Sequence, residues 1–253
     1  MIGHSDEAEP AAKVQGVGVA IGLPLILLSL ASGCMDILSY RQLGEVFTSA
    51  MTGNAALLGL EIGRGNLSAT FRNLAAFAGF LLGLAAGAAL LRDARSRSGW
   101  SRAITSTLVL EEALLVGFVV LWHYGAGPSS DRLLYGLIAL SAAAMGIQST
   151  IAHRIGVPGI TTTYFTGTLT SIAMGLIGHR PTPEAPARPG MRWPMLAFLV
   201  YVVGAALAGA LDTYSPAALA ALAVPVVPLL PAVAVAVVLL IALVHRLVRH
   251  DAA

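Results

Sequence analysis

Six long apolar segments constrain the fold of this chain more than any other feature. They occupy roughly residues 19–40, 71–91, 103–124, 132–152, 194–212 and 219–244. Crossing a bilayer takes about 20 consecutive apolar residues in a helix, and a helix satisfies its own backbone polar groups in lipid. The composition agrees, because 57% of the residues are hydrophobic and 11% are charged, against about 25% charged in soluble domains. We therefore expect an all-α membrane protein with about six transmembrane helices.

Two weaker apolar segments, 46–62 and 159–178, each begin with a polar Thr-Gly element. The first element runs from Phe47 to Asn54 and the second from Thr161 to Thr168. A polar break at membrane depth is tolerated only where protein or a water-filled cavity surrounds it. These segments therefore predict two interrupted or re-entrant helices, and a matched pair of breaks points to a transporter-like binding site.

The distribution of positive charge favours six crossings with both termini in the cytoplasm. Positive residues collect on the cytoplasmic side of membrane proteins, and with six crossings only four of the 15 lysines and arginines lie outside: Arg41, Arg64, Arg72 and Arg132. Eight crossings would divide the same residues less unevenly and place the 92–102 cluster outside. The first 17 residues are polar and acidic, and we expect them to form a disordered tail.

The two halves of the membrane domain, 18–124 and 131–248, resemble each other. Asp36 aligns with Gln148, Thr52-Gly53 aligns with Thr166-Gly167, and Phe77–Gly83 aligns with Phe198–Gly204. With three crossings in each half, a duplication would make two pseudo-symmetric repeats of inverted orientation, a plan common in alternating-access transporters. Chance similarity between helices rich in alanine, leucine and glycine is the alternative.

Four motifs carry a resemblance to a known family. They are Gly33–Asp36, Met51–Asn54, Met145–Ser149 and Thr166–Thr170, in this order and spacing. The chain resembles the YoaK family of bacterial membrane proteins, catalogued as a domain of unknown function (DUF1275), over residues 20–248. The resemblance implies a multi-pass protein of the bacterial cytoplasmic (inner) membrane with about six helices. It implies no reaction.

The two helix breaks are the first candidate for a substrate-binding site. Glycine permits close approach, and a half-helix that begins at such a break presents free N–H groups with partial positive charge. Two facing breaks would form a polar pocket that tolerates an anion. The alternative is that the threonines only satisfy the local backbone. The residues concerned are Thr48, Thr52, Gly53, Asn54, Thr162, Thr163, Thr166, Gly167 and Thr168.

Asp36 and Gln148 complete the candidate substrate site. A carboxylate within a span is costly and is a functional candidate by default, so Asp36 is expected to bind a cation or a proton; the alternative is an interfacial carboxylate beside Arg41. Gln148 cannot titrate, and its alternative role is an interhelical hydrogen bond. Glu111 and Glu112 lie in the third strong apolar segment, 103–124, and are weaker candidates: either one of them faces a cavity or pairs with an arginine, or both lie at the inner interface.

Glycines recur at every fourth position in the second apolar segment, at Gly79, Gly83 and Gly87. Such a stripe of small residues allows two helices to approach closely. We expect it to pack either within the chain or between two subunits of a homodimer.

Other classes of function find less support in the sequence. No catalytic motif and no metal or cofactor site is visible, the single Cys34 excludes an intrachain disulfide, and the scattered arginines do not indicate a nucleic-acid surface. The leading hypothesis is a secondary transporter or permease for a small polar solute, an anion included, working in the lipid bilayer. The alternatives are a non-transport membrane scaffold, assembly factor or lipid-interacting protein and, third, an intramembrane enzyme.

Overall fold

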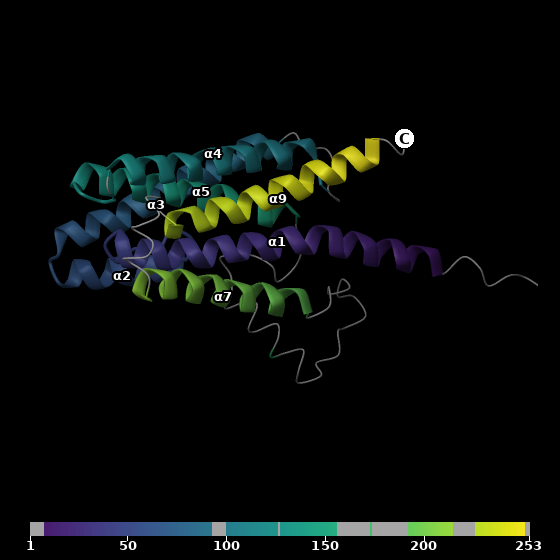
Figure 1. The fold of residues 1–253 in the computed structure, drawn as a ribbon. Helices are drawn as coiled ribbons and strands as arrows, with labels where there is room; N and C mark the ends of the chain where they lie inside the picture. Colours follow the sequence, from purple (N-terminus) through teal and green to yellow (C-terminus); the bar gives the residue numbers. More distant parts are fainter. Residues whose placement is uncertain are drawn as a thin grey trace, which may run out of the picture.

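The computed structural model describes residues 8–92, 100–125, 127–155, 173, 192–214 and 226–250. Within these residues the fold is entirely helical (Figure 1). Its elements are α1 (Ala8–Gln42), α2 (Met51–Gly63), α3 (Leu67–Leu91), α4 (Arg102–Gly125), α5 (Asp131–Ile155), α7 (Arg192–Tyr214) and α9 (Val226–His250). The all-α fold class expected from the apolar segments is confirmed.

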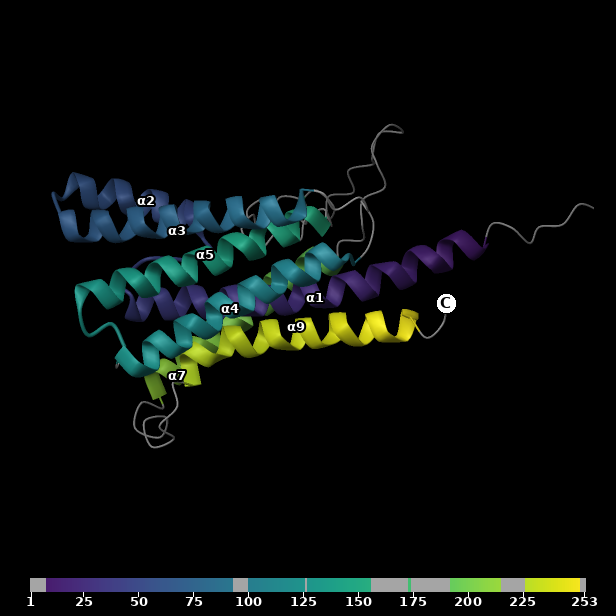
Figure 2. The same cartoon turned by 90° about the horizontal axis from the view of Figure 1, so that it is seen from above.

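Six of the described helices are long and apolar enough to cross a membrane. The candidate spans are Gly22–Gln42, Leu67–Leu91, Arg102–Gly125, Asp131–Ile155, Trp193–Tyr214 and Val226–Val244. They lie side by side in one bundle, and the start of α1 and the end of α9 lie at the same end of it (Figures 1 and 2). The number of spans matches the sequence-based expectation. Which end faces the cytoplasm stays a prediction from the charge distribution.

The N-terminal segment differs in part from the expectation. Helix α1 begins at Ala8, so the described part of segment 1–17 is helical, where the sequence predicts a disordered tail. The weaker apolar segment 46–62 forms α2, which begins at Met51 after a turn. Segment 159–178 lies outside the described residues except for one helical residue, Ala173.

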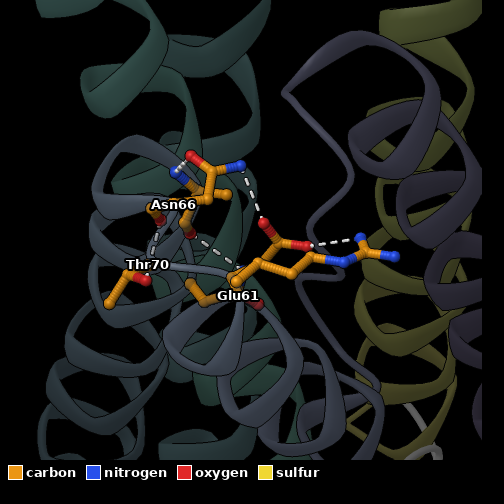
Figure 3. Close-up of polar contacts among 6 residues, drawn as sticks. Glu61, Asn66 and Thr70 are labelled. Atoms are coloured by element: carbon orange, nitrogen blue, oxygen red, sulfur yellow. Dashed lines mark hydrogen bonds and ion pairs between the residues drawn. The ribbon is translucent and has the colours of Figure 1, made fainter.

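Helix α2 forms a tight hairpin with α3 (Figure 2). Its 13 residues extend about 20 Å, less than the ~30 Å hydrocarbon core, so α2 alone is too short to cross. Gly65 adopts a φ of 70° in the connection, a conformation that glycine allows at little cost. Figure 3 shows how polar groups close the turn: Asn66 Nδ2 donates to Glu61 at 2.7 Å and Arg64 to the same carboxylate at 3.1 Å.

Asn66 and Thr70 fix the beginning of α3 (Figure 3). The Asn66 side-chain oxygen accepts from the Ala69 N–H at 3.3 Å, the usual N-cap interaction. Thr70 Oγ1 donates to the Asn66 carbonyl at 2.9 Å. The 92% buried Glu61 therefore acts at the α2–α3 turn as a structural acceptor.

Two helix crossings are so close that only glycine fits at their centres. In the first, α1 packs on α7, and a Cβ added at Gly33 or Gly204 would collide with the main chain of Tyr201 or Leu30. In the second, α5 packs on α3, where Gly146 faces the Phe80 main chain and Gly83 faces the Ala143 main chain. Small residues allow this approach, which maximises dispersion contact between membrane helices.

The glycine stripe of α3 therefore packs within the chain. Gly79, Gly83 and Gly87 are buried, and they face Ala139, Ala143 and Thr150 of α5. Helix α5 of the same chain covers this face, and whether the protein forms a homodimer stays a prediction. The expectation of packing within the chain is confirmed for this stripe.

We expect Gly33→Ala and Gly146→Ala each to lower the melting temperature of the purified protein. The added methyl group would meet main-chain atoms that move only if the helices separate, and such overpacking typically costs about 1–3 kcal/mol. Gly117→Ala in α4 is the matched control, because nothing lies within 4 Å of its added Cβ and alanine favours a helix over glycine by ~1 kcal/mol. Thermal melting of Gly33→Ala and Gly146→Ala at or above the temperature of Gly117→Ala would contradict the close packing.

Candidate functional site

Asp36 is the centre of the polar cluster at the first helix break. Asp36 lies on α1, and its side chain is fully buried. Its carboxylate accepts five hydrogen bonds. Oδ1 accepts from the N–H groups of Thr48 at 3.0 Å, Ser49 at 2.7 Å and Ala50 at 3.4 Å. Oδ2 accepts from Ser49 Oγ at 2.6 Å and from Tyr201 Oη at 2.8 Å. A buried carboxylate is tolerated when its acceptor sites are satisfied in this way.

These contacts explain how α2 begins inside the protein. Its N-cap residue, Ala50, has no side chain that can cap the helix. Asp36 of α1 instead accepts from the three N–H groups directly before the helix, those of Thr48, Ser49 and Ala50. A carboxylate at this position also interacts favourably with the positive end of the helix dipole.

Asn54 closes the break onto itself. It is fully buried, its Oδ1 accepts from the Phe47 N–H at 2.8 Å, and its Nδ2 donates to the Phe47 carbonyl at 2.5 Å. The Phe47 ring stacks on Tyr40 of α1 at a centroid distance of 5.1 Å. Gly53 lies against the same ring, since a Cβ added there would be 3.0 Å from it. The local backbone is thus satisfied by Asn54 and shielded by two aromatic rings.

The two threonines of the first break have different environments. Thr48 is fully buried, with its Oγ1 3.5 Å from Ser39 Oγ. Thr52 lies in the first turn of α2 with its side chain exposed. Among the predicted site residues, the structure brings Asp36, Thr48 and Asn54 together around the loop before α2. Thr52 lies on the outer side of that loop.

Gln148 of α5 contacts α1 one helical turn before Asp36. Its Nε2 donates to the Leu28 carbonyl at 3.0 Å and to Ser32 Oγ at 2.6 Å. Ser32 precedes Asp36 by four residues on α1, about 6 Å along the helix axis. The interhelical hydrogen bond expected as one role of Gln148 is therefore present. Its Oε1 is buried and has no hydrogen-bond partner among the described residues.

The second break lies outside the described residues. Its candidate residues, Thr162, Thr163, Thr166, Gly167 and Thr168, belong to the range 156–172. Whether the two breaks meet in one pocket stays a prediction. Within the described part of the chain, no group of three or more His, Cys, Asp or Glu side chains is placed to hold a metal ion.

The sequence analysis missed three contributors to the cluster: Ser32, Ser49 and Tyr201. A weak sequence signal could have indicated Ser32, because Ser29, Ser32 and Ser39 mark a buried polar face of α1. Tyr201 gave none, since it lies within an apolar segment of α7 far along the chain. The suggested partnership of Asp36 with Arg41 is wrong, because Arg41 pairs with Asp212 of α7 at 2.9 Å.

Comparison with known proteins places the chain in a family. The family model described as "Protein of unknown function (DUF1275)" matches residues 24–242. The chain belongs to this family. It is also 38% identical over 155 residues to the "UPF0700 transmembrane protein YoaK" of Bacillus subtilis (strain 168), which covers 61% of this chain and 67% of that relative. No solved structure matches the chain. The resemblance inferred from the four motifs is confirmed.

We expect Asp36→Asn to destabilise the DUF1275 protein more than Tyr201→Phe does. The amide keeps one oxygen for the N–H groups of the break but loses the charge, and its Nδ2 faces the Ser49 and Tyr201 hydroxyl groups that donate to Oδ2 in the wild type. Hydrogen bonds to a charged group contribute about 1.5–3 kcal/mol, more than the ~1 kcal/mol of neutral ones. Tyr201→Phe removes one donor while the N–H bonds to Asp36 remain. Thermal melting of both single variants and the double variant measures the coupling between them. Additive losses, or an unchanged melting temperature for Asp36→Asn, would show that the cluster does not hold the break.

Proposed function

We propose that the protein is a secondary transporter or permease for a small polar solute, an anionic one included, bound at the two helix breaks. The observation that carries the proposal is the matched packing of the two halves. Helix α1 packs on α7 as α5 packs on α3, and α1 packs on α9 as α5 packs on α4. Two equivalent halves around a common axis are the architecture that supports alternating access.

The glycine contacts support this equivalence at single residues. Gly33 and Leu30 of α1 meet Tyr201 and Gly204 of α7, while Gly146 and Ala143 of α5 meet Phe80 and Gly83 of α3. Helices α1 and α5 run in opposite directions along the bundle (Figures 1 and 2). These features favour duplication with inversion over chance similarity.

The same contacts change the register of the proposed repeat by one residue. Counting from Gly33 and Gly146, Asp36 corresponds to Ser149, and Gln148 corresponds to Met35. Tyr201, the donor to Asp36, corresponds to Phe80, which has no donor. Within the proposed repeat, the helix crossings therefore favour a register one residue away from the alignment of Asp36 with Gln148, because small apolar residues align in several registers.

The position of α2 supports a re-entrant element. The loop before α2 is bonded to Asp36, six residues before α1 ends at Gln42, which places the start of α2 about 9 Å inside that end of the bundle. Helix α2 then leads the chain back to this end, and α3 runs from there along the bundle (Figure 2). A half-helix that starts inside the bundle presents its positive end there.

The contacts at the first break determine which of its polar groups are left to bind a solute. The N–H groups of Thr48, Ser49 and Ala50 already bind Asp36. Thr52, in the first turn of α2, is exposed, and its side chain makes no hydrogen bond within the described part of the chain. The exposed first turn favours a polar or anionic solute at Thr52, because helix N-termini attract negative charge. Asp36 then positions the site and does not touch the solute.

One observation favours the alternative of a non-transport membrane scaffold or lipid-interacting protein. Asp36 and Asn54 satisfy most backbone groups of the first break within the chain itself. A purely structural break needs no more than this. The two functions differ in what a bulky residue beside α2 does, because only a transporter requires solute access to its first turn.

We expect Gly53→Leu to abolish solute uptake while Gly53→Ala retains it. Alanine meets the Phe47 ring at 3.0 Å, which a small ring shift relieves, whereas leucine displaces Phe47 and reshapes the start of α2. Uptake of a panel of radiolabelled inorganic anions, carboxylates, amino acids and sugars is measured in proteoliposomes and in empty liposomes. Gel filtration of both variants confirms that they remain folded. Uptake equal to that of empty liposomes across the panel, or equal uptake by the two variants, would count against transport and favour the scaffold.

A further inference from the structure

We propose that Glu111 is a proton-binding carboxyl group in the middle of the membrane-spanning bundle. It lies on the buried stripe of α4 that includes Leu108, Leu115 and Phe118, and its exposed fraction is 0%. Helix α4 packs mainly against α5 and α9, so this stripe faces the interior of the bundle. Nine residues separate Glu111 from the start of α4 at Arg102, about 13 Å along the axis, which is near mid-membrane.

The carboxyl group of Glu111 has no hydrogen-bond partner among the described residues. Both of its oxygens are buried and unpaired within the part of the chain that the structure describes. Asp36, equally buried, accepts five hydrogen bonds. Removing a carboxylate from water without compensating donors is costly. Glu111 therefore lacks the groups that would hold it as a carboxylate, and a bound proton removes the charge.

No basic side chain of the described neighbours lies at the depth of Glu111. The titratable or charged residues of α5 are Asp131, Arg132, Tyr135, His153 and Arg154, all within about two turns of its ends. Helix α3 carries only Arg72 near its start and is followed by Arg92, and Val226–Val244 of α9 carries none.

On α4 itself, the adjacent Glu112 is the titratable group nearest to Glu111 in the chain. It is partly exposed, and one of its oxygens, Oε2, is buried without a partner. A second carboxyl group on the next residue adds like charge, which favours a proton on one of the two. The other charged or titratable residues of α4, Arg102, His123 and Tyr124, lie at its ends.

The proton site deepens the proposed function. An unpartnered intramembrane carboxyl is retained at a cost in stability, and such groups commonly serve proton relays in transporters. The sequence predicts that Asp36 binds a cation or a proton. The geometry instead gives Asp36 the role of positioning α2, and it leaves Glu111 as the group able to exchange a proton. The coupling role rests on the proposed transport activity, whereas the proton on Glu111 rests on its surroundings alone.

The first test is infrared spectroscopy of the full-length protein in liposomes at neutral pH. We expect the carbonyl stretch of a protonated carboxyl group in the wild type, its loss in Glu111→Gln, and its retention in the matched variant Glu112→Gln. Glu111→Gln should keep or raise the melting temperature, because no bond to the carboxylate is lost. Absence of the band from the wild type, its persistence in Glu111→Gln, or a strong loss of stability in that variant would overturn the proposal.

The second test uses dicyclohexylcarbodiimide, which adds the O–H of a protonated carboxyl across one C=N bond to give an O-acylisourea. The acyl group then migrates from oxygen to nitrogen and leaves a stable N-acylurea on the side chain. We expect peptide mass spectrometry to locate the adduct on Glu111, with less labelling as the pH rises. Glu111→Gln should lack the adduct and Glu112→Gln should retain it. Labelling of Asp36 in place of Glu111, no labelling of Glu111, or protection by sodium ions at constant pH would contradict a proton site.

Proton transport is measured separately, with a pH-sensitive dye inside the proteoliposomes. If a panel solute drives proton entry in the wild type, Glu111→Gln should lose it, and the matched variant Glu112→Gln should retain it. Spectroscopic detection of the proton without any solute-driven flux would refute the coupling role and leave the site intact. Flux without the infrared band or the adduct would refute the site and leave transport intact.

Discussion

The backbone groups of the chain have to be satisfied inside the bundle wherever water is absent, and the rest of the structure depends on this constraint. Residues 43–50 leave the helical pattern between α1 and α2. Asp36 solves the resulting problem, because one buried carboxylate accepts from three consecutive backbone N–H groups and from two hydroxyl groups. The charge that would be costly alone becomes the anchor of a helix that begins inside the protein.

Close helix packing makes this anchor possible. Gly33 lies three residues before Asp36, and it allows α7 to approach α1 until Tyr201 reaches the carboxylate at 2.8 Å. Cys34 adds a weak contact from its sulfur to the Gly204 carbonyl at 3.3 Å. The equivalent crossing of α5 and α3 has the same glycine arrangement but carries Ser149 and Phe80 at the positions of Asp36 and Tyr201. The two halves thus share a packing scheme while their polar chemistry differs.

The sequence predicted what depends on local pattern. Hydropathy gave the six spans, and the Thr-Gly element gave the start of α2, because both follow from short stretches of residues. The partners of Asp36 and Arg41 could not be predicted from the sequence. Tyr201 and Asp212 are more than 150 residues away, and they lie in an apolar segment with no regular pattern of polar residues. The sequence also left open which partner the Gly79–Gly87 stripe packs against, because a glycine face can pack on a second subunit or on a neighbouring helix of the same chain. The unpaired state of Glu111 is a property of three packed helices and has no signature in the residues of α4 alone.

The central claim is that Asp36 holds the beginning of α2 inside the bundle, and amide hydrogen exchange tests it most directly. Exchange of individual backbone amides reports local opening. The account predicts slow exchange at Thr48, Ser49 and Ala50 in the wild type and much faster exchange there and in the first turn of α2 in Asp36→Asn. The α3–α5 crossing around Gly83 and Gly146 should remain protected in both. Equal protection of residues 48–50 in the wild type and in Asp36→Asn would contradict the account.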